Sequence, residues 1–281
     1  VIGGAGARSA FLTKSLVKST RDIRVDHIVL LDNDQQKLKT YGEISRELSR
    51  RLDPDLTFEV TSDARAALTG VDYIITTIRA GGDAGRLFDE QTCLAHGVLG
   101  QETTGAGGFA MAIRSVPTLV YYCTLAREVA NPGHLIFNFT NPSGIITQAL
   151  RSKGFDNVYG ICDAPSGFIK QLEEILEIPY GTLDIECYGL NHLSWFRNAK
   201  VNGRDVQREL LDNPRTYEHS EMRLFTREMA RISGDCMLNE YLYFYYRRVK
   251  SLSMIQKADH PRGEMIYLIN RELEEQLARL E

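Results

Sequence analysis

The chain has 281 residues, of which 43% are hydrophobic and 25% charged, and its net charge is −4. This is the ordinary composition of a globular protein, long enough for one large domain or two smaller ones, and it excludes disorder as the main state. The acidic balance provides no basic excess to attract nucleic acid, and no apolar run approaches the roughly 20 residues of a membrane span. We therefore expect neither a nucleic-acid nor a membrane partner.

The N-terminal 180 residues alternate between strand-like and helical patterns. Short apolar runs predict strands over residues 28–32, 71–78, 134–139 and 157–161. Apolar spacings of three and four residues predict helices over 35–52, 109–130 and 166–177, the second kinked or restarted by Pro117. Such alternation is typical of an α/β fold, a Rossmann-like doubly wound parallel sheet.

The pattern changes after about residue 178. Segment 183–202 is strand-rich, and from residue 220 onward the chain is helical, polar and rich in tyrosine. We expect a Rossmann-like domain over residues 1–180 and an α+β domain over residues 181–281. The five cysteines are odd in number, scattered and without a Cys-x-x-Cys pair, and no secretory signal peptide is recognisable, which together favour reduced thiols in a cytoplasmic protein.

Residues 3–9 (GGAGARS) lie where the first predicted strand turns into a helix. Gly4, Gly6 and Ala7 let the backbone approach a pyrophosphate, and the helix N-terminus supplies N–H donors. Asp32 ends the second strand, where its carboxylate can accept hydrogen bonds from ribose hydroxyls and would repel the phosphate of NADP. Together they predict NAD binding, although a serine replaces the third fingerprint glycine; a glycine-rich turn and a surface aspartate are the alternatives.

Further polar clusters lie at predicted strand ends or loops, where α/β folds place their chemistry. They occupy residues 78–82, 100–108, 138–144, 160–165 and 189–193. Each could instead be a turn or a helix start.

Cys162 and His192 form the sharpest candidate pair. A thiolate and an imidazole are too few ligands for a closed structural zinc site, but they suit a divalent ion that also binds substrate oxygens and water. Asn191 could orient the imidazole. The alternatives are a small buried thiol and a histidine satisfied by structural contacts.

Several motifs occur in a characteristic order: GGAG, IRAGG, GQETTGAGGF, NFTNPSG, GICDAP, YGLNHLSW and NEYLYFYY. Over its whole length the chain resembles the family 4 glycoside hydrolases, which use NAD and a divalent metal, and within them the 6-phospho-β-glucosidases. Asp163 stands where β-type members often have asparagine and α-type members aspartate, which leaves a 6-phospho-α-glucosidase or another family 4 α-glycosidase open. Members are usually longer, so we expect the second domain, for substrate and metal, to be incomplete at its C-terminus.

The resemblance implies hydrolysis of a phosphorylated disaccharide by redox elimination instead of by two opposed carboxylates. NAD takes a hydride from C3, a base removes the C2 proton, the leaving oxygen departs, water adds and the hydride returns. Cys162 and His192 would hold the metal, which is Mn²⁺ in this family. Tyr241 matches the base, and a nearby cation would have to lower its ordinary pKa of about 10. The alternative for Tyr241 is that the tyrosines of this segment form a packing surface. Asp163 is the candidate acid, and its alternative role is to accept hydrogen bonds and so orient the metal ligands.

Arginines are the candidates for binding the 6-phosphate, because a guanidinium binds phosphate in a bidentate manner. They are Arg79, Arg86 and Arg262, and Arg79 is also counted among the cofactor-binding residues. A surface ion pair is the alternative, more so for Arg86 than for Arg79. Asn141 would hydrogen-bond the sugar hydroxyls. The resemblance also implies a homo-oligomer, either a dimer or a tetramer.

Three rival functions remain open. A plain NAD-dependent 2-hydroxy acid dehydrogenase of the lactate/malate type would need no metal. A family member that acts on an unphosphorylated sugar would not require the phosphate. A catalytically inactive NAD-binding sensor would turn over nothing.

Overall fold

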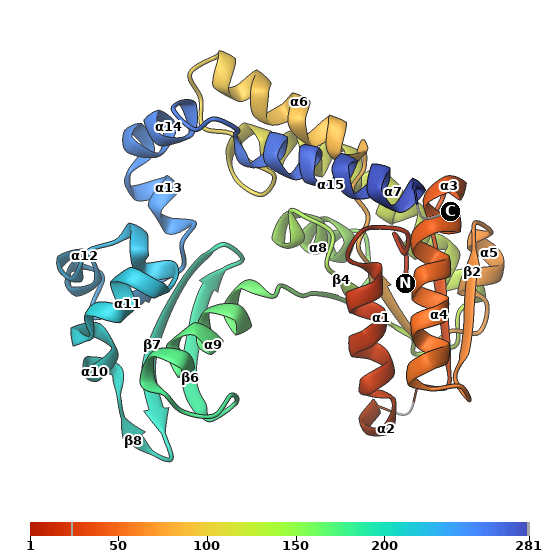
Figure 1. Cartoon of the computed structure of the whole chain (residues 1–281), viewed down its shortest axis with the longest axis horizontal. Coiled ribbons are helices and arrows are strands. Elements are labelled where there is room, and N and C mark those ends of the chain that lie inside the picture. The colour runs from red at the N-terminus through yellow and green to blue at the C-terminus, as the bar shows by residue number, and fades with distance from the viewer. Residues whose placement is uncertain (24, 280–281) are drawn as a thin grey trace. The chain divides into compact units, whose positions relative to one another are not determined.

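The computed structural model of the chain describes residues 1–23 and 25–279 (Figure 1). The chain divides into two compact units. Unit 1 comprises Val1–His96, Gly100–Ile161 and Asp259–Glu281, and unit 2 comprises Gly97–Leu99 and Cys162–Ala258. This division differs from the expected boundary at residue 180.

Two helices account for that difference. Helix α9 (Ala164–Leu176) belongs to unit 2, because its side chains Phe168 and Leu172 are fully buried in that unit's core. Helix α15 (Arg262–Ala278) lies at the end of the sequence but belongs to unit 1, where it packs against α6 (Gly82–Ala95). The boundary at residue 180 therefore separates α9 from its core, and no single boundary along the sequence places α15 in unit 1.

Unit 1 is built on parallel strands. They are β1 (His27–Leu31), β2 (Thr57–Thr61), β3 (Tyr73–Thr76), β4 (Leu135–Asn138) and β5 (Val158–Gly160). Strand β1 pairs with β2, and β4 lies between β3 and β5. Ile2 bridges Leu31 and Thr76 in parallel, which gives the order β2-β1-Ile2-β3-β4-β5. This is the order of doubly wound dinucleotide-binding folds and confirms the Rossmann-like expectation, with the first strand reduced to one bridging residue.

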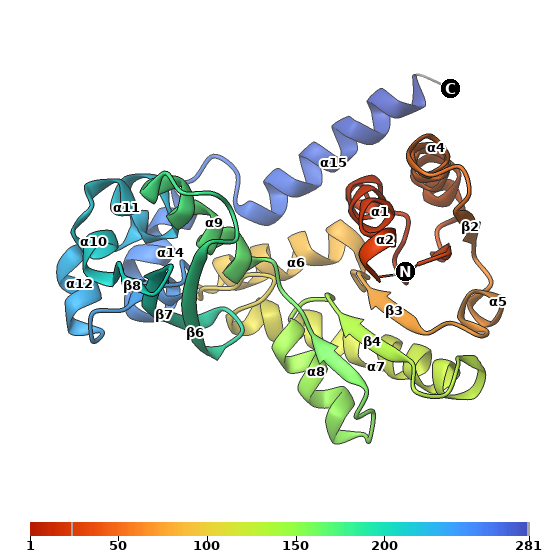
Figure 2. The same cartoon turned by 90° about the horizontal axis from the view of Figure 1, so that it is seen from below.

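Helices cover both faces of this sheet. Besides α6, they include α1 (Ser9–Lys18), α2 (Thr20–Ile23), α3 (Gln35–Lys37), α4 (Glu43–Leu52), α5 (Ala64–Leu68), α7 (Gly105–Val129) and α8 (Ser143–Ser152). Figure 2 shows α1 and α4 on one face of the sheet and α7 and α8 on the other. The predicted helix over 35–52 is confirmed as α3, a π-helical turn over Leu38–Gly42, and α4. Helix α7 runs through Pro117 without ending there.

By length and composition alone, α7 could cross a membrane, and no other helix in the described part of the chain meets that test. The sequence-based expectation that no segment approaches such a length is thus too strict. The test is weak for a single helix, because core helices of soluble proteins also pass it. Leu119, Cys123 and Ala126 of α7 are buried in the hydrophobic core of unit 1, which accounts for its apolar composition.

Unit 2 combines an antiparallel sheet with short helices. Its strands are β6 (Leu183–Leu190), β7 (Leu193–Val201), β8 (Arg204–Asp205) and β9 (Met237–Leu238). After β8 come α10 (Gln207–Asp212), α11 (Pro214–His219), a 3-10 turn (Glu221–Leu224), α12 (Arg227–Ile232), α13 (Leu242–Tyr246) and α14 (Arg248–Gln256). Phe168 of α9 and Phe196 of β7, both fully buried, pack edge to face with ring centroids 4.9 Å apart. This packing holds α9 against the hairpin of β6 and β7.

Candidate functional site

In unit 1, the turn between Ile2 and α1 lies against β1. The backbone N–H groups of Gly3 and Gly4 both donate to the Leu31 carbonyl at 2.9 Å. A Cβ on Gly4 would lie 2.8 Å from the Cβ of Leu30, whereas a Cβ on Gly6 would meet nothing within 4 Å. Gly4 is therefore required for packing, and the backbone at Gly6 is open to the approach of a ligand.

The carboxylate of Asp32 is held at the end of β1. Its Oδ2 accepts from the Ala5 N–H and its Oδ1 from the Asp34 N–H, both at 3.1 Å. Ser9, where a third glycine was expected, accepts from the Gly6 N–H at 3.0 Å through its Oγ. The N-cap residue of α1, Arg8, makes no side-chain capping hydrogen bond to the described residues. The loop that contains Gly4, Gly6 and Ala7 thus has the free helix end and the oriented acid that a dinucleotide requires.

Arg79 and Arg86 lie in a network of ion pairs within unit 1. Glu102 bridges them, with 3.0 Å from its oxygens to Nη2 of Arg79 and to Nη1 of Arg86. Arg79 also pairs with Asp83, and Arg86 pairs with Glu90 at 2.9 Å. The side chain of Arg86 is 7% exposed. Two carboxylates thus neutralise its guanidinium. A phosphate ligand would therefore have to compete with them for Arg86.

The other two predicted substrate residues are more accessible. Arg262 is exposed at the first position of α15, after Pro261. Asn141 is half-buried just beyond β4, at the carboxyl edge of the sheet where Asp32 and Arg79 also follow strands. The structure therefore places Asp32, Arg79 and Asn141 along one edge of the sheet, as predicted for α/β folds.

In unit 2, Cys162 and His192 come together although 30 residues separate them. The Sγ of Cys162 lies 3.4 Å from Nε2 of His192. Cys162 precedes α9, and the Ala164 N–H donates to its sulfur at 3.5 Å. A thiolate and an imidazole at this separation converge as two ligands of one cation do, and the pair suits a divalent metal that is completed by other oxygens. No cluster of three or more such ligands occurs among the residues described.

His192 adopts an unusual backbone conformation. It lies in the two-residue turn between β6 and β7 with φ of +59°, a left-handed value that favours glycine. A non-glycine residue in this region costs roughly 1–2 kcal/mol. The imidazole is nevertheless 7% exposed and directed to Cys162. Residues held in this conformation cluster at active sites and ligand-binding sites.

Tyr241 packs on the face of the same imidazole. Its ring stacks on that of His192 with centroids 4.0 Å apart and an angle of 1° between the planes. Among the neighbouring tyrosines, Tyr245 and Tyr246 are exposed, and Tyr243 packs edge to face on Phe225. The geometry thus distinguishes Tyr241 from the others of its cluster.

Asp163 is exposed at the N-cap position of α9, next to Cys162. Its side chain makes no capping hydrogen bond to the described residues, whereas its backbone carbonyl accepts from the Gly167 N–H and from Ser166 Oγ. The carboxylate is therefore available for another role near the thiol.

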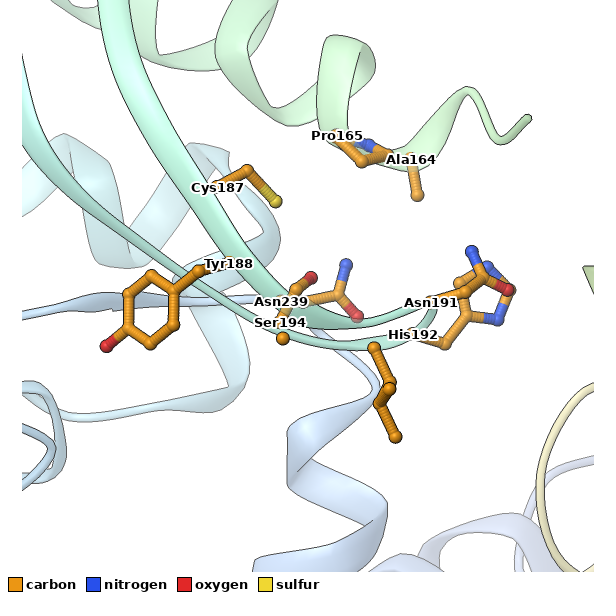
Figure 3. A pocket seen from close by; sticks show the side chains of 10 residues that line it. Ala164, Pro165, Cys187, Tyr188, Asn191, His192, Ser194 and Asn239 are labelled. Carbon is orange, nitrogen blue, oxygen red and sulfur yellow. The ribbon is translucent and has the colours of Figure 1, made fainter. Parts of the chain in front are cut away.

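A cavity of about 160 Å³ lies beside these residues. It is lined by Ala164, Pro165, Cys187, Tyr188, Gly189, Leu190, Asn191, His192, Ser194 and Asn239. In Figure 3 the Cys187 and Asn239 side chains point into the space between the β6–β7 hairpin and the first turn of α9. The cavity is small and belongs entirely to unit 2.

The sequence-based predictions did not single out Glu102, Asn239 or Glu221. Glu221 is 8% exposed, and burial raises the pKa of its carboxyl to about 7. Its Oε2 accepts from Nδ2 of Asn239 at 3.0 Å. Asn239 could have been found from its position two residues before Tyr241. Nothing in the local sequence indicates a role for Glu221.

The chain matches two family descriptions in order. Residues 1–178 match "Family 4 glycosyl hydrolase", and residues 187–281 match "Family 4 glycosyl hydrolase C-terminal domain". The 6-phospho-beta-glucosidase of Thermotoga maritima is 35% identical over 215 residues, which are 76% of this chain and 50% of that protein. The chain spans about half the length of several curated relatives that it matches.

Solved structures agree with this match. The Thermotoga maritima enzyme, with manganese, NAD+ and glucose-6-phosphate, superposes with a TM-score of 0.87 at 30% identity, covering 98% of this chain and 66% of that one. A 6-phospho-alpha-glucosidase from gut microorganisms, in complex with NAD and Mn2+, gives 0.87 at 26% identity, covering 100% and 69%. Malate dehydrogenase from Salinibacter ruber, at 17% identity and 0.55, covering 86% and 71%, shares the fold alone. The chain belongs to the family 4 glycosyl hydrolases.

Proposed function

We propose that the protein hydrolyses 6-phospho-β-glucosides by NAD-dependent redox elimination with the help of a divalent metal. The observation that carries this proposal is the convergence of Cys162, His192 and Tyr241 in unit 2. A thiol and an imidazole next to a stacked phenol provide a metal-binding pair and a proton acceptor. A plain hydroxy-acid dehydrogenase has no use for such a pair.

The two cofactors would be NAD and Mn²⁺, which are present in the related solved structures. When bound, NAD⁺ would supply a hydride acceptor and the metal would supply Lewis acidity toward the sugar oxygens. Gly4, Gly6 and Ala7 would accommodate the pyrophosphate, and Asp32 would accept hydrogen bonds from the ribose. Cys162 and His192 would hold the metal.

The protein's own side chains would move the protons. Tyr241 would take the proton from C2, which is acidic when C3 is a ketone. The positive charge of a metal ion held by His192 would favour the phenolate form of Tyr241. Asp163, exposed beside Cys162, would protonate the leaving oxygen. Asn141 would bind sugar hydroxyls.

The 6-phosphate would be bound by Arg262, the exposed member of the arginine set. Arg79 and Arg86 would contribute only if the phosphate displaced Glu102, which bridges them at 3.0 Å. A cytoplasmic homo-oligomer acting on a phosphorylated disaccharide completes the proposal; light scattering during size-exclusion chromatography would measure the oligomer.

A second candidate is a 6-phospho-α-glucosidase, which the carboxylate of Asp163 next to Cys162 favours. The α-type relatives are also similar, for instance a phospho-alpha-glucosidase of Clostridium acetobutylicum at 29% identity over 265 residues, 87% of this chain and 59% of that protein.

The test measures nitrophenol released from both anomers of nitrophenyl glucoside 6-phosphate, with NAD⁺, Mn²⁺ and a reductant. We expect turnover of the β anomer that chelation abolishes and Mn²⁺ restores. Turnover of only the α anomer would support the second candidate. If the folded, NAD-binding protein cleaves neither anomer, the phosphoglucosidase assignment is wrong.

A further inference from the structure

We propose that Glu221 and Asn239 are positioning residues that together hold Tyr241 against His192. The inference deepens the proposed function, because it rests on Tyr241 acting as the base. It concerns two buried polar side chains in unit 2 that are not among the candidate metal and sugar ligands.

The first step is a relay of hydrogen bonds. The carboxylate Oε2 of Glu221 accepts from the Asn239 Nδ2 at 3.0 Å and from the Glu240 N–H at 3.2 Å. The Oδ1 of Asn239 in turn accepts from the Tyr241 N–H at 3.1 Å. Three consecutive residues, 239 to 241, are thus tied by one carboxylate and one amide.

The second step is the anchoring of this relay. The Asn239 N–H donates to the Ser194 carbonyl at 3.1 Å, on the strand that follows His192. The Glu221 N–H donates to Oε1 of Gln171 in α9 at 2.9 Å. Asn239 is 1% exposed. The turn before α13 is therefore attached to both β7 and α9, the two elements that begin next to His192 and Cys162.

The third step is the cost of the arrangement. A buried carboxylate needs compensation, but Arg223, whose positive charge acts on Glu221, is exposed and pairs with Glu240 at 3.1 Å. Asp163 and Glu240 add further negative charge around Glu221, and the donors that hydrogen-bond its carboxylate are the Glu240 N–H and the Asn239 amide. A hydrophobic residue would pack there at lower cost, so the carboxylate is explained by what it orients.

The experiment replaces the Glu221 carboxylate and measures the position of the Tyr241 ring. Glu221→Leu removes both hydrogen bonds, whereas Glu221→Gln keeps an acceptor oxygen of the same shape. The control is Glu173→Leu: Glu173 is 2% exposed and also accepts from two backbone N–H groups, those of Thr182 and Leu183 at 2.9 and 3.0 Å. Both leucine variants lose a similar buried carboxylate, but only that of Glu221 belongs to the hydrogen bonds that lead to Tyr241.

The first readout needs no catalysis. Carbon-13 NMR of Cζ-labelled tyrosine, assigned with Tyr241→Phe, reports the ring current of the imidazole on Tyr241. We expect Glu221→Leu to move this resonance toward the position of an exposed tyrosine, and Glu221→Gln and Glu173→Leu to leave it in place. An unchanged resonance in folded Glu221→Leu overturns the inference. If that variant does not fold, Asn239→Ala replaces it, with the same two outcomes.

The second readout is kinetic. Displacement of a base by about 1 Å can cost about 100-fold in rate. We expect Glu221→Leu to lower kcat by 10- to 100-fold with KM within about twofold, and to raise the isotope effect of C2-deuterated substrate. Glu221→Gln should restore kcat to within about threefold of the native value. An equal loss in Glu173→Leu would overturn the inference by showing a general structural effect.

The two proposals fail in different ways. If the native protein cleaves no phosphoglucoside, the proposed function fails while the NMR comparison still decides whether Glu221 holds the ring. If the native protein is active but the Tyr241 resonance ignores Glu221, only the positioning role is lost.

Discussion

The imidazole of His192 and the phenol of Tyr241 lie parallel, with centroids 4.0 Å apart. The contact joins the β6–β7 turn to the turn before α13, elements almost 50 residues apart. The stacking contact with His192 uses the face of the Tyr241 ring, whereas acid–base chemistry requires its phenol oxygen. The two contributions can therefore be separated by mutation.

Tyr241→Phe keeps the stacked ring and removes the proton acceptor. We expect kcat to fall by about 10²- to 10⁴-fold, the usual contribution of a general base. Mn²⁺ affinity, measured by electron paramagnetic resonance titration, should stay unchanged, because Cys162 and His192 remain. Tyr246→Phe, at an exposed tyrosine of the same cluster, is the control. If the control loses activity and Tyr241→Phe does not, Tyr241 is not the base.

The left-handed turn at His192 predicts a difference between two truncations. His192→Gly and His192→Ala both remove the imidazole and should abolish Mn²⁺ binding. Glycine adopts φ of +59° without strain, so His192→Gly should be more stable than His192→Ala by about 1 kcal/mol. Urea unfolding of the two variants measures this difference. Equal stabilities would show that the turn relaxes when the imidazole is absent.

Gly263 predicts a tight contact in unit 1. A Cβ at this position would lie 2.6 Å from Oε2 of Glu90, which also accepts from the Gly263 N–H at 2.7 Å. Gly263→Ala should therefore loosen α15, at a cost of about 1–3 kcal/mol, and hydrogen exchange over residues 262–278 should accelerate. Gly167→Ala in α9, where a Cβ meets nothing within 4 Å, should instead stabilise its helix. Unchanged exchange in Gly263→Ala would contradict the close packing.

Glu221 predicts a pH-dependent stability. Burial raises the pKa of its carboxyl from 4.5 to about 7 in the folded state. Between these values the folded protein binds more protons than the unfolded chain, so this group's contribution to stability declines as pH rises from about 4.5 through 7. The pKa difference corresponds to at most roughly 3 kcal/mol.

Glu221→Gln cannot ionise and should lack this part of the pH dependence. Denaturant unfolding at pH 5 and pH 8 should show the variant gaining stability relative to the native protein at the higher pH. Parallel curves for the two proteins would mean that the carboxyl titrates normally.

Local patterns in the sequence predicted most of the parallel sheet. The apolar runs at 71–78, 134–139 and 157–161 contain β3, β4 and β5, because buried parallel strands need continuous apolar stretches. Strand β2 (Thr57–Thr61) was not predicted, because its apolar residues alternate with polar ones and form no continuous apolar run like those of the other strands. These outcomes follow from how much of each strand is buried.

The site shows a similar division. Cys162, His192 and Tyr241 could be named because each stands in a distinctive motif, and the structure brings them together. The pairing of Arg86 with Glu102 could not be foreseen, because nothing in a single sequence states which acid of a loop pairs with an arginine of the preceding helix. Assignment of α15 to unit 1 failed for the same reason.

The contact between Glu90 and Gly263 joins residues 173 positions apart and has a consequence for biosynthesis. A ribosome adds about 5–20 residues per second, so α6 emerges roughly ten seconds or more before its partner helix exists. During that interval Glu90 lacks the backbone donor of Gly263, and the face of α6 that α15 covers is bare. Nascent chains stalled before residue 262 should therefore bind chaperones at α6 more strongly than chains stalled after residue 278.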